Sequence, residues 1–374
     1  MKGFYRRSYD TLSVTTAIVL GTRPELIKMA PVFFALKEQG QEVLLIHSGQ
    51  HYDHALSESF IQDLGLRKPD HFLEVGSGTQ GYQTAEIIHR LEKVLAEKRP
   101  EMVLVQGDTN TVLAGALAAA KMDIKVGHVE AGLRSNDRRM PEEYNRRVAD
   151  HISHYLFAPT PDSARILEDE KVWGEVFMTG NTVIDACERY VQQAEEKSQV
   201  AKVIPFEDYI LVTAHRAENV DDKNVLEGLM NVLTNAPLPV VYPLHPRTKK
   251  MLELFGLYDK LAGSNNVHLI PPVGYFDFLA LMKKCRFIFT DSGGIQEEAT
   301  SPSIRKRVLV FRKSTERPEA VQSGYAVMVG TDADDVAKAL ENEASNQETP
   351  TAPSPYGDGN AGRNIANIVM EASQ

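Results

Sequence analysis

Short apolar runs alternate along the chain with longer stretches in which apolar residues recur at helical spacing. In the first half these runs are 17–22, 43–49, 102–108, 126–132 and 155–160. The stretch 84–98, TAEIIHRLEKVLAEK, shows the helical spacing between two of them. Continuous apolar strands are typical of a parallel sheet that helices cover on both faces. The pattern therefore predicts an α/β fold with a doubly wound parallel sheet.

The same alternation begins again in the second half of the chain. The second series of apolar runs is 209–215, 239–246, 267–274, 287–294, 307–312 and 325–330. A connector rich in Pro, Gly and Ser, 348–362, follows. Because 374 residues exceed one ordinary core, we predict two doubly wound domains, 16–185 and 186–355. A last helix, 363–374, is expected to pack back on the first domain.

Composition narrows the class of protein. A hydrophobic content of 43% and a charged content of 25% are typical of a soluble globular chain. The net charge of −10 argues against a nucleic-acid partner, which would need a basic face. An anionic substrate is compatible with this charge if cations gather locally. Cys187 and Cys285 have no zinc or redox spacing, so we expect reduced thiols in a cytoplasmic protein.

The amino terminus superficially resembles a signal peptide. Basic residues within 1–10 precede the apolar stretch LSVTTAIVL, which Thr15 and Thr16 interrupt and no A-x-A cleavage site follows. We therefore expect residues 1–15 to form a loose extension and 17–20 the first strand. No segment reaches the roughly 18–20 apolar residues of a membrane span, so no membrane association is expected.

The stretch TDSGGIQEEA, 290–299, leaves an apolar run and opens a helix. The N–H groups of Ser292, Gly293 and Gly294 would lie at the positive end of that helix, which suits a phosphate. An ordinary turn that uses Gly for positive φ explains this stretch alone equally well. The two glutamates after it lie too close to a phosphate to bind it, so one of them would accept sugar hydroxyls.

The segment GTRPELIK, 21–28, follows the first strand. Gly21 permits a tight turn, and Arg23 and Lys28 place cations near the start of a helix, where Arg suits bidentate phosphate binding. By itself the segment is better explained as a solvated helix start. No G-x-G-x-x-G follows the first strand and no GxxxxGK[ST] occurs, so a dinucleotide site or a P-loop is disfavoured.

Acidic residues follow neighbouring strands of the first half. Asp108 ends one strand, Glu130 ends the next, and Glu142 and Glu143 begin the following helix. Any one of them could be a helix cap. Three acidic sites on neighbouring turns are harder to explain as caps, because like charges raise one another's pKa and prepare the groups for proton transfer.

Cationic side chains follow strands of the second half. His215 ends the strand 209–215, and His245 occupies the equivalent place in PLHPRTKK. Arg317 precedes a helix that starts with proline. A single histidine after a strand is more often structural than catalytic. Together, however, His215, His245 and Arg317 would add cationic donors near the expected cleft.

Seven segments, in this order, carry a specific resemblance: GTRPE, GDTNT, HVEAGLRS, PEEYNR, TAHR, TDSGGIQEEA and TERPEAV. They closely resemble the motifs of the non-hydrolysing UDP-N-acetylglucosamine 2-epimerases, over about residues 17–330. The resemblance implies a GT-B-type fold, in which two Rossmann-like domains face a cleft. It also implies interconversion of UDP-GlcNAc and UDP-ManNAc by a cytoplasmic homodimer that supplies ManNAc units for polysaccharide biosynthesis.

The resemblance also assigns roles to individual residues. The acids of the family match Asp108, Glu130 and Glu142, and its leaving-group histidine matches His215. Its substrate-binding positions match Arg23, Lys28, Ser292, Gly293, Gly294, Glu298 and Arg317, with Phe278 near the uracil. On this assignment Glu298 accepts ribose hydroxyls, and Glu297 is left outward or structural.

The sequence departs from the family pattern in three places. HRAEN replaces the usual HRRE, and Val273 stands where some members have Gln, which leaves open a regulatory second substrate site and the exact base contacts. The segment SPSIRKR, 301–307, is about two residues longer than usual, and we expect a surface-loop change there.

The implied reaction needs neither a metal nor a nicotinamide cofactor. The C2 proton of the sugar is not adjacent to a carbonyl, so UDP must leave C1 before a carboxylate can remove that proton and give 2-acetamidoglucal. Donors around the diphosphate would stabilise the departing UDP, and domain closure would exclude water. Three alternatives are a hydrolysing epimerase that releases ManNAc, a retaining GT-B glycosyltransferase, and a non-catalytic nucleotide-sugar sensor.

Overall fold

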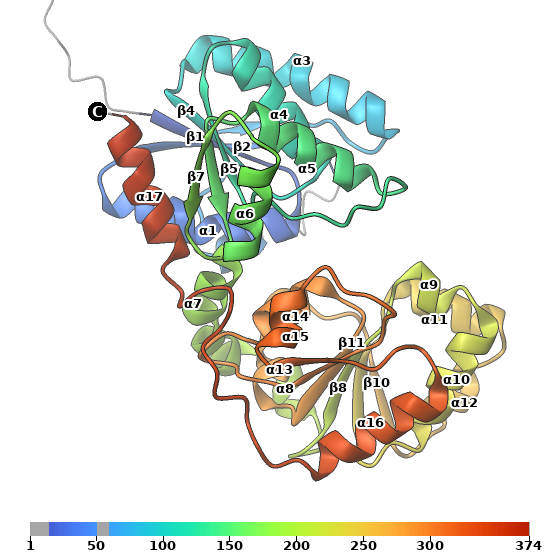
Figure 1. The fold of residues 1–374 in the computed structure, drawn as a ribbon. Coiled ribbons are helices and arrows are strands. Elements are labelled where there is room, and N and C mark those ends of the chain that lie inside the picture. Colours follow the sequence, from blue (N-terminus) through green and yellow to red (C-terminus); the bar gives the residue numbers. More distant parts are fainter. Residues whose placement is uncertain (1–14, 51–59, 374) are drawn as a thin grey trace, which may run out of the picture. The chain divides into compact units, whose positions relative to one another are not determined.

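The computed structural model describes residues 15–50 and 60–373. The expected amino-terminal extension lies outside this range except for its last residue. The chain divides into two compact units, the first running to Thr182 and resuming at Asn360, the second comprising Val183–Gly359 (Figure 1).

The first unit contains a seven-stranded sheet in the order β3-β2-β1-β4-β5-β6-β7, and every adjacent pair is parallel. Its strands are β1 (Thr15–Leu20), β2 (Glu42–His47), β3 (His71–Phe72), β4 (Met102–Gln106), β5 (Lys125–Val129), β6 (Tyr155–Ala158) and β7 (Glu175–Met178). Its helices are α1 (Arg23–Glu38), α3 (Gln80–Lys98), α4 (Asn110–Lys121), α5 (Pro141–Ile152), α6 (Pro161–Asp169) and α17 (Ala361–Ala372). The strand order reverses between β1 and β4, so the turns after these two strands are the expected ligand-binding position.

Alternation along the strands buries both faces of this sheet. Ala17 and Val19 of β1 belong to the cluster that α3 and α4 cover, whereas Ile18 and Leu20 face the other side and are equally buried. The small residues of α4 permit close packing, since a Cβ added at Gly115 would lie 2.9 Å from a methyl of Val105. Double coverage therefore explains the continuous apolar runs.

The last helix, α17, begins at Ala361, two residues before the expected start, and lies against α1 (Figure 1). A Cβ added at Gly362 would lie 2.9 Å from the carbonyl carbon of Pro31. At the carboxyl end of α1, the Gln39 side-chain amide donates to Asn367 Oδ1 at 2.6 Å. A glycine thus permits the close approach, and the carboxyl-terminal segment belongs to the first unit.

The second unit contains a six-stranded parallel sheet in the order β10-β9-β8-β11-β12-β13. Its strands are β8 (Ile210–Thr213), β9 (Val240–Pro243), β10 (Val267–Ile270), β11 (Phe287–Thr290), β12 (Val308–Val310) and β13 (Ala326–Met328). Its helices are α7 (Thr182–Lys197), α8 (Val200–Val203), α9 (Ala217–Val220), α10 (Lys223–Thr234), α11 (Pro246–Leu254), α12 (Tyr258–Ala262), α13 (Tyr275–Lys284), α14 (Gly293–Glu298), α15 (Pro318–Gln322) and α16 (Ala333–Ser345). Here the order reverses between β8 and β11.

The predicted α/β class is confirmed, and each predicted apolar run contains a strand. The runs extend beyond the strands because their last residues form the turns that follow. The sequence pattern missed β3 and β7, the two edges of the first sheet. β3 has only two residues, and the apolar run of β7, 176–178, is short and only partly buried. Among the described helices none is both long and apolar enough to cross a membrane.

Candidate functional site

The turn after β1 is built around the buried carboxyl group of Glu25. Its Oε2 accepts the backbone N–H groups of Gly21 at 2.5 Å and Thr22 at 2.8 Å, and its Oε1 accepts the Thr109 hydroxyl at 2.5 Å. Burial raises the pKa of Glu25 to about 7, against the effect of these hydrogen bonds. One carboxyl group therefore ties the turn after β1 to the turn after β4, on either side of the switch point.

Asp108 lies on the turn after β4 and is not a helix cap. The N-cap of α4 is Thr109, whose hydroxyl accepts the Val112 N–H at 3.4 Å. The carboxylate of Asp108 instead pairs with Arg146 of α5, with Oδ2 and Nη2 2.5 Å apart. Its carbonyl oxygen accepts the Asn145 amide at 2.9 Å. The helix α5 thus holds both the backbone and the side chain of this acid.

Glu130 follows β5 directly and has a left-handed backbone, with φ of +68°. Its N–H donates to the Phe157 carbonyl at 3.1 Å. Its carboxylate accepts the Gln106 amide at 2.8 Å and forms an ion pair with Lys28, which lies 102 positions earlier on α1. In this unit Lys28, which the resemblance assigned to substrate binding, lies against an acid of the site.

The two acids at the start of α5 have different surroundings. Glu143 is buried and accepts the N–H and hydroxyl of Ser135, both at 2.9 Å, and the Arg147 Nε at 2.9 Å. Although burial opposes ionisation, these contacts hold the pKa of Glu143 below its ordinary value. Glu142 is only half-buried and makes none of these contacts within the described residues. Of the pair, Glu142 is therefore the one accessible for chemistry.

Arg23, at the first position of α1, is exposed, and its guanidinium carbon lies 5.8 Å from the centre of the Phe60 ring. The cation therefore lies at the open end of the turn after β1.

In the second unit a buried acid, Asp291, organises the turn after β8. Its Oδ2 accepts the N–H groups of His215 and Arg216, both at 2.9 Å, and the Asn219 amide at 3.1 Å. Its Oδ1 lies 3.1 Å from Nδ1 of His215. Burial opposes the charge of Asp291, but the bonds from His215, Arg216 and Asn219 keep its pKa below the ordinary value. A carboxylate on Nδ1 fixes the orientation of the imidazole ring.

His215 is partly exposed and stacks at a tilt on His245, with ring centres 5.2 Å apart. His245 caps α11 by accepting the Arg247 N–H at 3.2 Å. Burial, followed by the charges of His215 and Arg247, lowers the pKa of His245. The two histidines predicted at strand ends are therefore brought together.

The turn after β11 does not use glycine for positive φ. Neither Gly293 nor Gly294 is among the described residues with positive φ, so that interpretation is wrong. The Ser292 N–H already donates to the Thr290 hydroxyl at 3.0 Å, while its own hydroxyl does not cap α14. A Cβ at Gly294 would meet no atom within 4 Å. The N–H groups of the first turn of α14 lack intrahelical acceptors, as at every helix start.

The two glutamates of QEE differ in burial. Glu297 is 1% exposed and accepts the Nε of Arg317, so the suggestion that it points outward is wrong and the structural one is right. Glu298 is half-buried. Burial of the Cys187 thiol is the main cause that raises its pKa, and the charge of Glu298 raises it further. Phe278, on α13, is also half-buried. Arg317 is therefore held by the acid beside the one expected to accept ribose hydroxyls.

Comparison with known proteins shows what this chain is similar to. Residues 35–370 match the family model described as UDP-N-acetylglucosamine 2-epimerase. This chain belongs to the UDP-N-acetylglucosamine 2-epimerase family. A UDP-N-acetylglucosamine 2-epimerase of Methanococcus maripaludis is 44% identical over 362 residues, which cover 94% of this chain and 97% of that protein.

Two solved epimerases of the family have the same fold. The UDP-GlcNAc 2-epimerase of Methanocaldococcus jannaschii, in complex with UDP-GlcNAc and UDP, matches with a TM-score of 0.84 and 42% identity, covering 96% of this chain and 99% of that one. The Neisseria meningitidis enzyme bound to UDP-GlcNAc matches with a TM-score of 0.86 and 36% identity, covering 96% and 100%. The two Rossmann-like domains are therefore of the GT-B type, as the motifs indicated.

Sequence reasoning singled out the acids and cations of the family motifs but missed their partners. Arg146 and Gln106 hold the acids of the first unit, and Asp291 holds His215 in the second. Glu25, which stands inside GTRPELIK, was given no role. Asp291 stands inside TDSGG, and its place directly after a buried strand is the signal that could have identified it.

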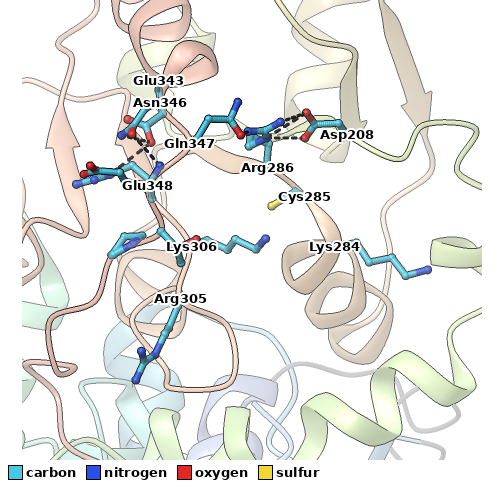
Figure 2. Close-up of a pocket in the computed structure, with 13 residues that line it drawn as sticks. Asp208, Lys284, Cys285, Arg286, Arg305, Lys306, Glu343, Asn346, Gln347 and Glu348 are labelled. Carbon is cyan, nitrogen blue, oxygen red and sulfur yellow. Dashed lines mark hydrogen bonds and ion pairs between the residues drawn. The ribbon is translucent and has the colours of Figure 1, made fainter.

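A separate pocket of about 300 Å³ lies in the second unit (Figure 2). It is lined by residues that precede β8, β11 and β12, among them Asp208, Arg286 and Lys306, so it lies at the amino end of the sheet. Arg305, Lys306 and Arg307 of the segment 301–307, where we expected a surface-loop change, line this pocket. Arg286 is paired with Asp208, and Lys284 and Arg305 point away from each other (Figure 2). None of the predicted site residues of the epimerase motifs lines it.

Proposed function

We propose that this protein interconverts UDP-GlcNAc and UDP-ManNAc by eliminating UDP to give 2-acetamidoglucal and adding it back. The observation that carries the proposal is the set of acids at the switch-point edge of the first sheet. Asp108 and Glu130 follow adjacent strands, and Glu142 starts the next helix. The names of the relatives, which are UDP-N-acetylglucosamine 2-epimerases, support the same reaction.

The chemistry explains why the reaction would need several acids. Loss of UDP breaks the C1–O bond and gives C1 oxocarbenium character, which acidifies the proton on C2. A carboxylate takes that proton and leaves the C1–C2 double bond of the glucal. An acid on the opposite face returns a proton to C2, and UDP oxygen adds back to C1. Asp108, Glu130 and Glu142 are the proposed proton carriers.

The second unit would bind the leaving group. Diphosphate charge develops as C1–O breaks, and donors aimed at it lower the barrier. The proposed donors are the Gly293 and Gly294 N–H groups, the Ser292 hydroxyl, His215 and Arg317, with Arg23 and Lys28 from the first unit. Glu298 would accept ribose hydroxyls and Phe278 would lie near the uracil. The reaction also needs exclusion of water from the bound intermediate. The route uses no metal and no nicotinamide.

The test follows the C2 hydrogen by NMR. UDP-GlcNAc incubated in D₂O without added cofactor should gain one deuterium at C2 in both epimers, and the bridging oxygen should scramble with a non-bridging phosphate oxygen. A keto route would leave C1–O intact and could return the original hydrogen. Retention of that hydrogen with an unscrambled oxygen would therefore rule out elimination and re-addition.

The same time course separates the other activities. Free ManNAc and UDP without UDP-ManNAc would indicate a hydrolysing epimerase, the first alternative, which the unbroken GTRPE and HVEAGLRS motifs disfavour. No reaction unless an acceptor is added would indicate a glycosyltransferase. Binding without turnover would indicate a sensor of nucleotide sugars.

We also propose a cytoplasmic homodimer that supplies ManNAc units for polysaccharide biosynthesis. Exposed Tyr144 and Val148, one helical turn apart on α5, offer an apolar stripe of the kind that interfaces cover. Sedimentation should give about twice the 41.6 kDa chain mass. A single species of chain mass at micromolar concentration would contradict the dimer.

A further inference from the structure

His128 is a fully buried histidine with a hydrogen-bond acceptor on each ring nitrogen. It is the fourth residue of β5 and its side chain is 0% exposed. Its Nδ1 lies 2.7 Å from Asp150 Oδ1, and its Nε2 lies 2.7 Å from the Gly107 carbonyl oxygen. The sequence motif HVEAGLRS contains this histidine, yet the proposed reaction gives it no role.

The two acceptors determine the protonation state of the ring. A neutral imidazole has one N–H and one lone pair, and a carbonyl oxygen cannot donate. A neutral ring would fit only if Asp150 carried the proton. That arrangement is disfavoured because Asp150 Oδ2 accepts Arg134 Nη1 at 2.7 Å and the Gly132 N–H at 3.3 Å. A doubly protonated ring beside an ionised carboxylate satisfies every contact.

The charged groups around the ring agree with this arrangement. Asp150 faces it from α5, and Arg134 faces Asp150 from the loop after β5. Arg134 also binds Glu170 after α6, which Arg147 of α5 contacts from the other side. Burial acts against the cation, but the charge and hydrogen bond of Asp150 and the Gly107 carbonyl raise the pKa of His128 above its ordinary value. Burial likewise opposes the carboxylate, yet His128 and Arg134 lower the pKa of Asp150.

The ring connects two turns that carry proposed catalytic acids. Gly107 directly precedes Asp108, and His128 stands two residues before Glu130. Gly107 has φ of +86° and Glu130 has φ of +68°, so both turns have left-handed backbones that their surroundings must hold in place. A single side chain thus fixes the backbone of one turn relative to the other.

We propose that His128 is a positioning residue that acts as an imidazolium, holding the Gly107 carbonyl and so keeping Asp108 in register with Glu130. Its effect on turnover rests on the proposed epimerase function, whereas its protonation state does not.

Loss of the proton would release the turn. The neutral ring keeps its hydrogen on Nδ1, where Asp150 accepts it, and then presents the Nε2 lone pair to the Gly107 oxygen. Two lone pairs cannot remain at a hydrogen-bonding distance, so the Gly107–Asp108 turn moves away. Turnover and stability of the first unit should therefore both fall as pH rises through the folded-state pKa of His128.

One substitution separates positioning from charge. In Asp150→Asn, the side-chain amide can donate to Nδ1, so a neutral ring would keep its Nε2–H for the Gly107 carbonyl. We expect this variant to fold, to keep the turn in place and to lose the alkaline decline of kcat. His128→Phe removes both bonds and should lower kcat on the order of 10²-fold with little change in KM, as a small displacement of a catalytic group does.

The decisive measurement is NMR of protein carrying ¹⁵N-labelled histidine. At about pH 8, well above the ordinary imidazole pKa, the His128 signal should show two protonated nitrogens. Its assignment comes from its absence in His128→Gln, with His89→Gln, a change on α3, as the control. A neutral ring at this pH in the wild type would overturn the proposal, whether or not the protein is an epimerase. An unchanged alkaline limb of kcat in Asp150→Asn would overturn it as well.

Discussion

The two units place functional groups at the same edge of similar sheets but hold them in different ways. In the first unit two of the three acids are each fixed by a side chain from a distant element, since Lys28 fixes Glu130 and Arg146 fixes Asp108. In the second unit one buried acid, Asp291, gathers backbone N–H groups and a histidine. Under the proposed function, the first arrangement would suit proton transfer, which requires titratable side chains whose surroundings set their pKa. The second would suit a diphosphate, which requires only donors in fixed positions.

The glycines of the two units show the same contrast. A Cβ at Gly21 would lie 2.3 Å from both the Ser48 and the Thr111 hydroxyl oxygens, so this turn is enclosed by side chains. A Cβ at Gly294 would meet nothing within 4 Å. The first glycine is required for packing within its unit, whereas a Cβ at the second would have no neighbouring atom to displace.

The largest expected effect tests the acids of the first unit. Asp108→Asn, Glu130→Gln and Glu142→Gln should each lower kcat by about 10²–10⁴-fold, because a positioned acid or base contributes this much. The affinity for UDP should not change, since these residues act on the sugar. Asp162→Asn, an exposed acid on α6, is the matched control. Near-normal epimerisation in all three variants would make the acid cluster structural.

The next effect tests the donors of the second unit. Arg317→Ala and Ser292→Ala should weaken UDP binding by about 10–100-fold, the value of one or two hydrogen bonds to a charged group. Calorimetry measures the affinity, and the melting temperature is followed because Glu297 loses its partner in Arg317→Ala. Unchanged affinity in both variants would remove the case for a phosphate site on these turns.

The glycine contrast can be tested by a matched pair of substitutions. Gly21→Ala should lower the free energy of unfolding by about 1–3 kcal/mol, because overpacking a closed turn displaces its neighbours. Gly294→Ala should unfold like the wild type while its UDP affinity falls. Denaturant unfolding and calorimetry measure the two quantities, and equal stability losses in both variants would erase the contrast between enclosed and open turns.

The smallest expected effect is a pH dependence of opposite sign in the two units. Burial raises the pKa of Glu25 to about 7, so the folded first unit binds more protons than the unfolded chain between about pH 4.5 and 7. Its contribution is present below 4.5 and is lost as pH rises through 7, which costs on the order of 1–3 kcal/mol. In the second unit, burial opposes the charge of Glu316 but Arg312 lowers its pKa to about 2, so its contribution is lost as pH falls from 4.5 toward 2.

Hydrogen exchange resolved by peptide can follow each unit separately. Glu25→Gln should remove the loss between about pH 4.5 and 7 in the first unit only, and Glu316→Gln the acid loss in the second only. If either variant alters the pH dependence of the other unit instead, the assignment of these carboxyl groups is wrong.

Local patterns in the sequence were sufficient for most of the described strands and for the turns on which the candidate site residues lie. Buried parallel strands appear in the sequence as continuous apolar runs. Of the described strands, β3 and β7 were missed, because β3 is very short and β7 is partly exposed. The ordered motifs likewise indicated the family that the comparisons show. These features depend on residues close in sequence, where period and turn chemistry are encoded.

Only the tertiary structure decided which charged groups became partners. Lys28 meets an acid 102 positions away, and Arg146 meets one 38 positions away, distances over which no sequence period operates. Glu142 and Glu143 are adjacent and look equivalent in the sequence. In the structure Glu143 is the buried one of the two, and its carboxylate contacts Ser135 and the arginines of α5. A charge finds its partner through burial, because desolvation penalises every arrangement in which it lacks one, and burial is a property of the whole packed domain.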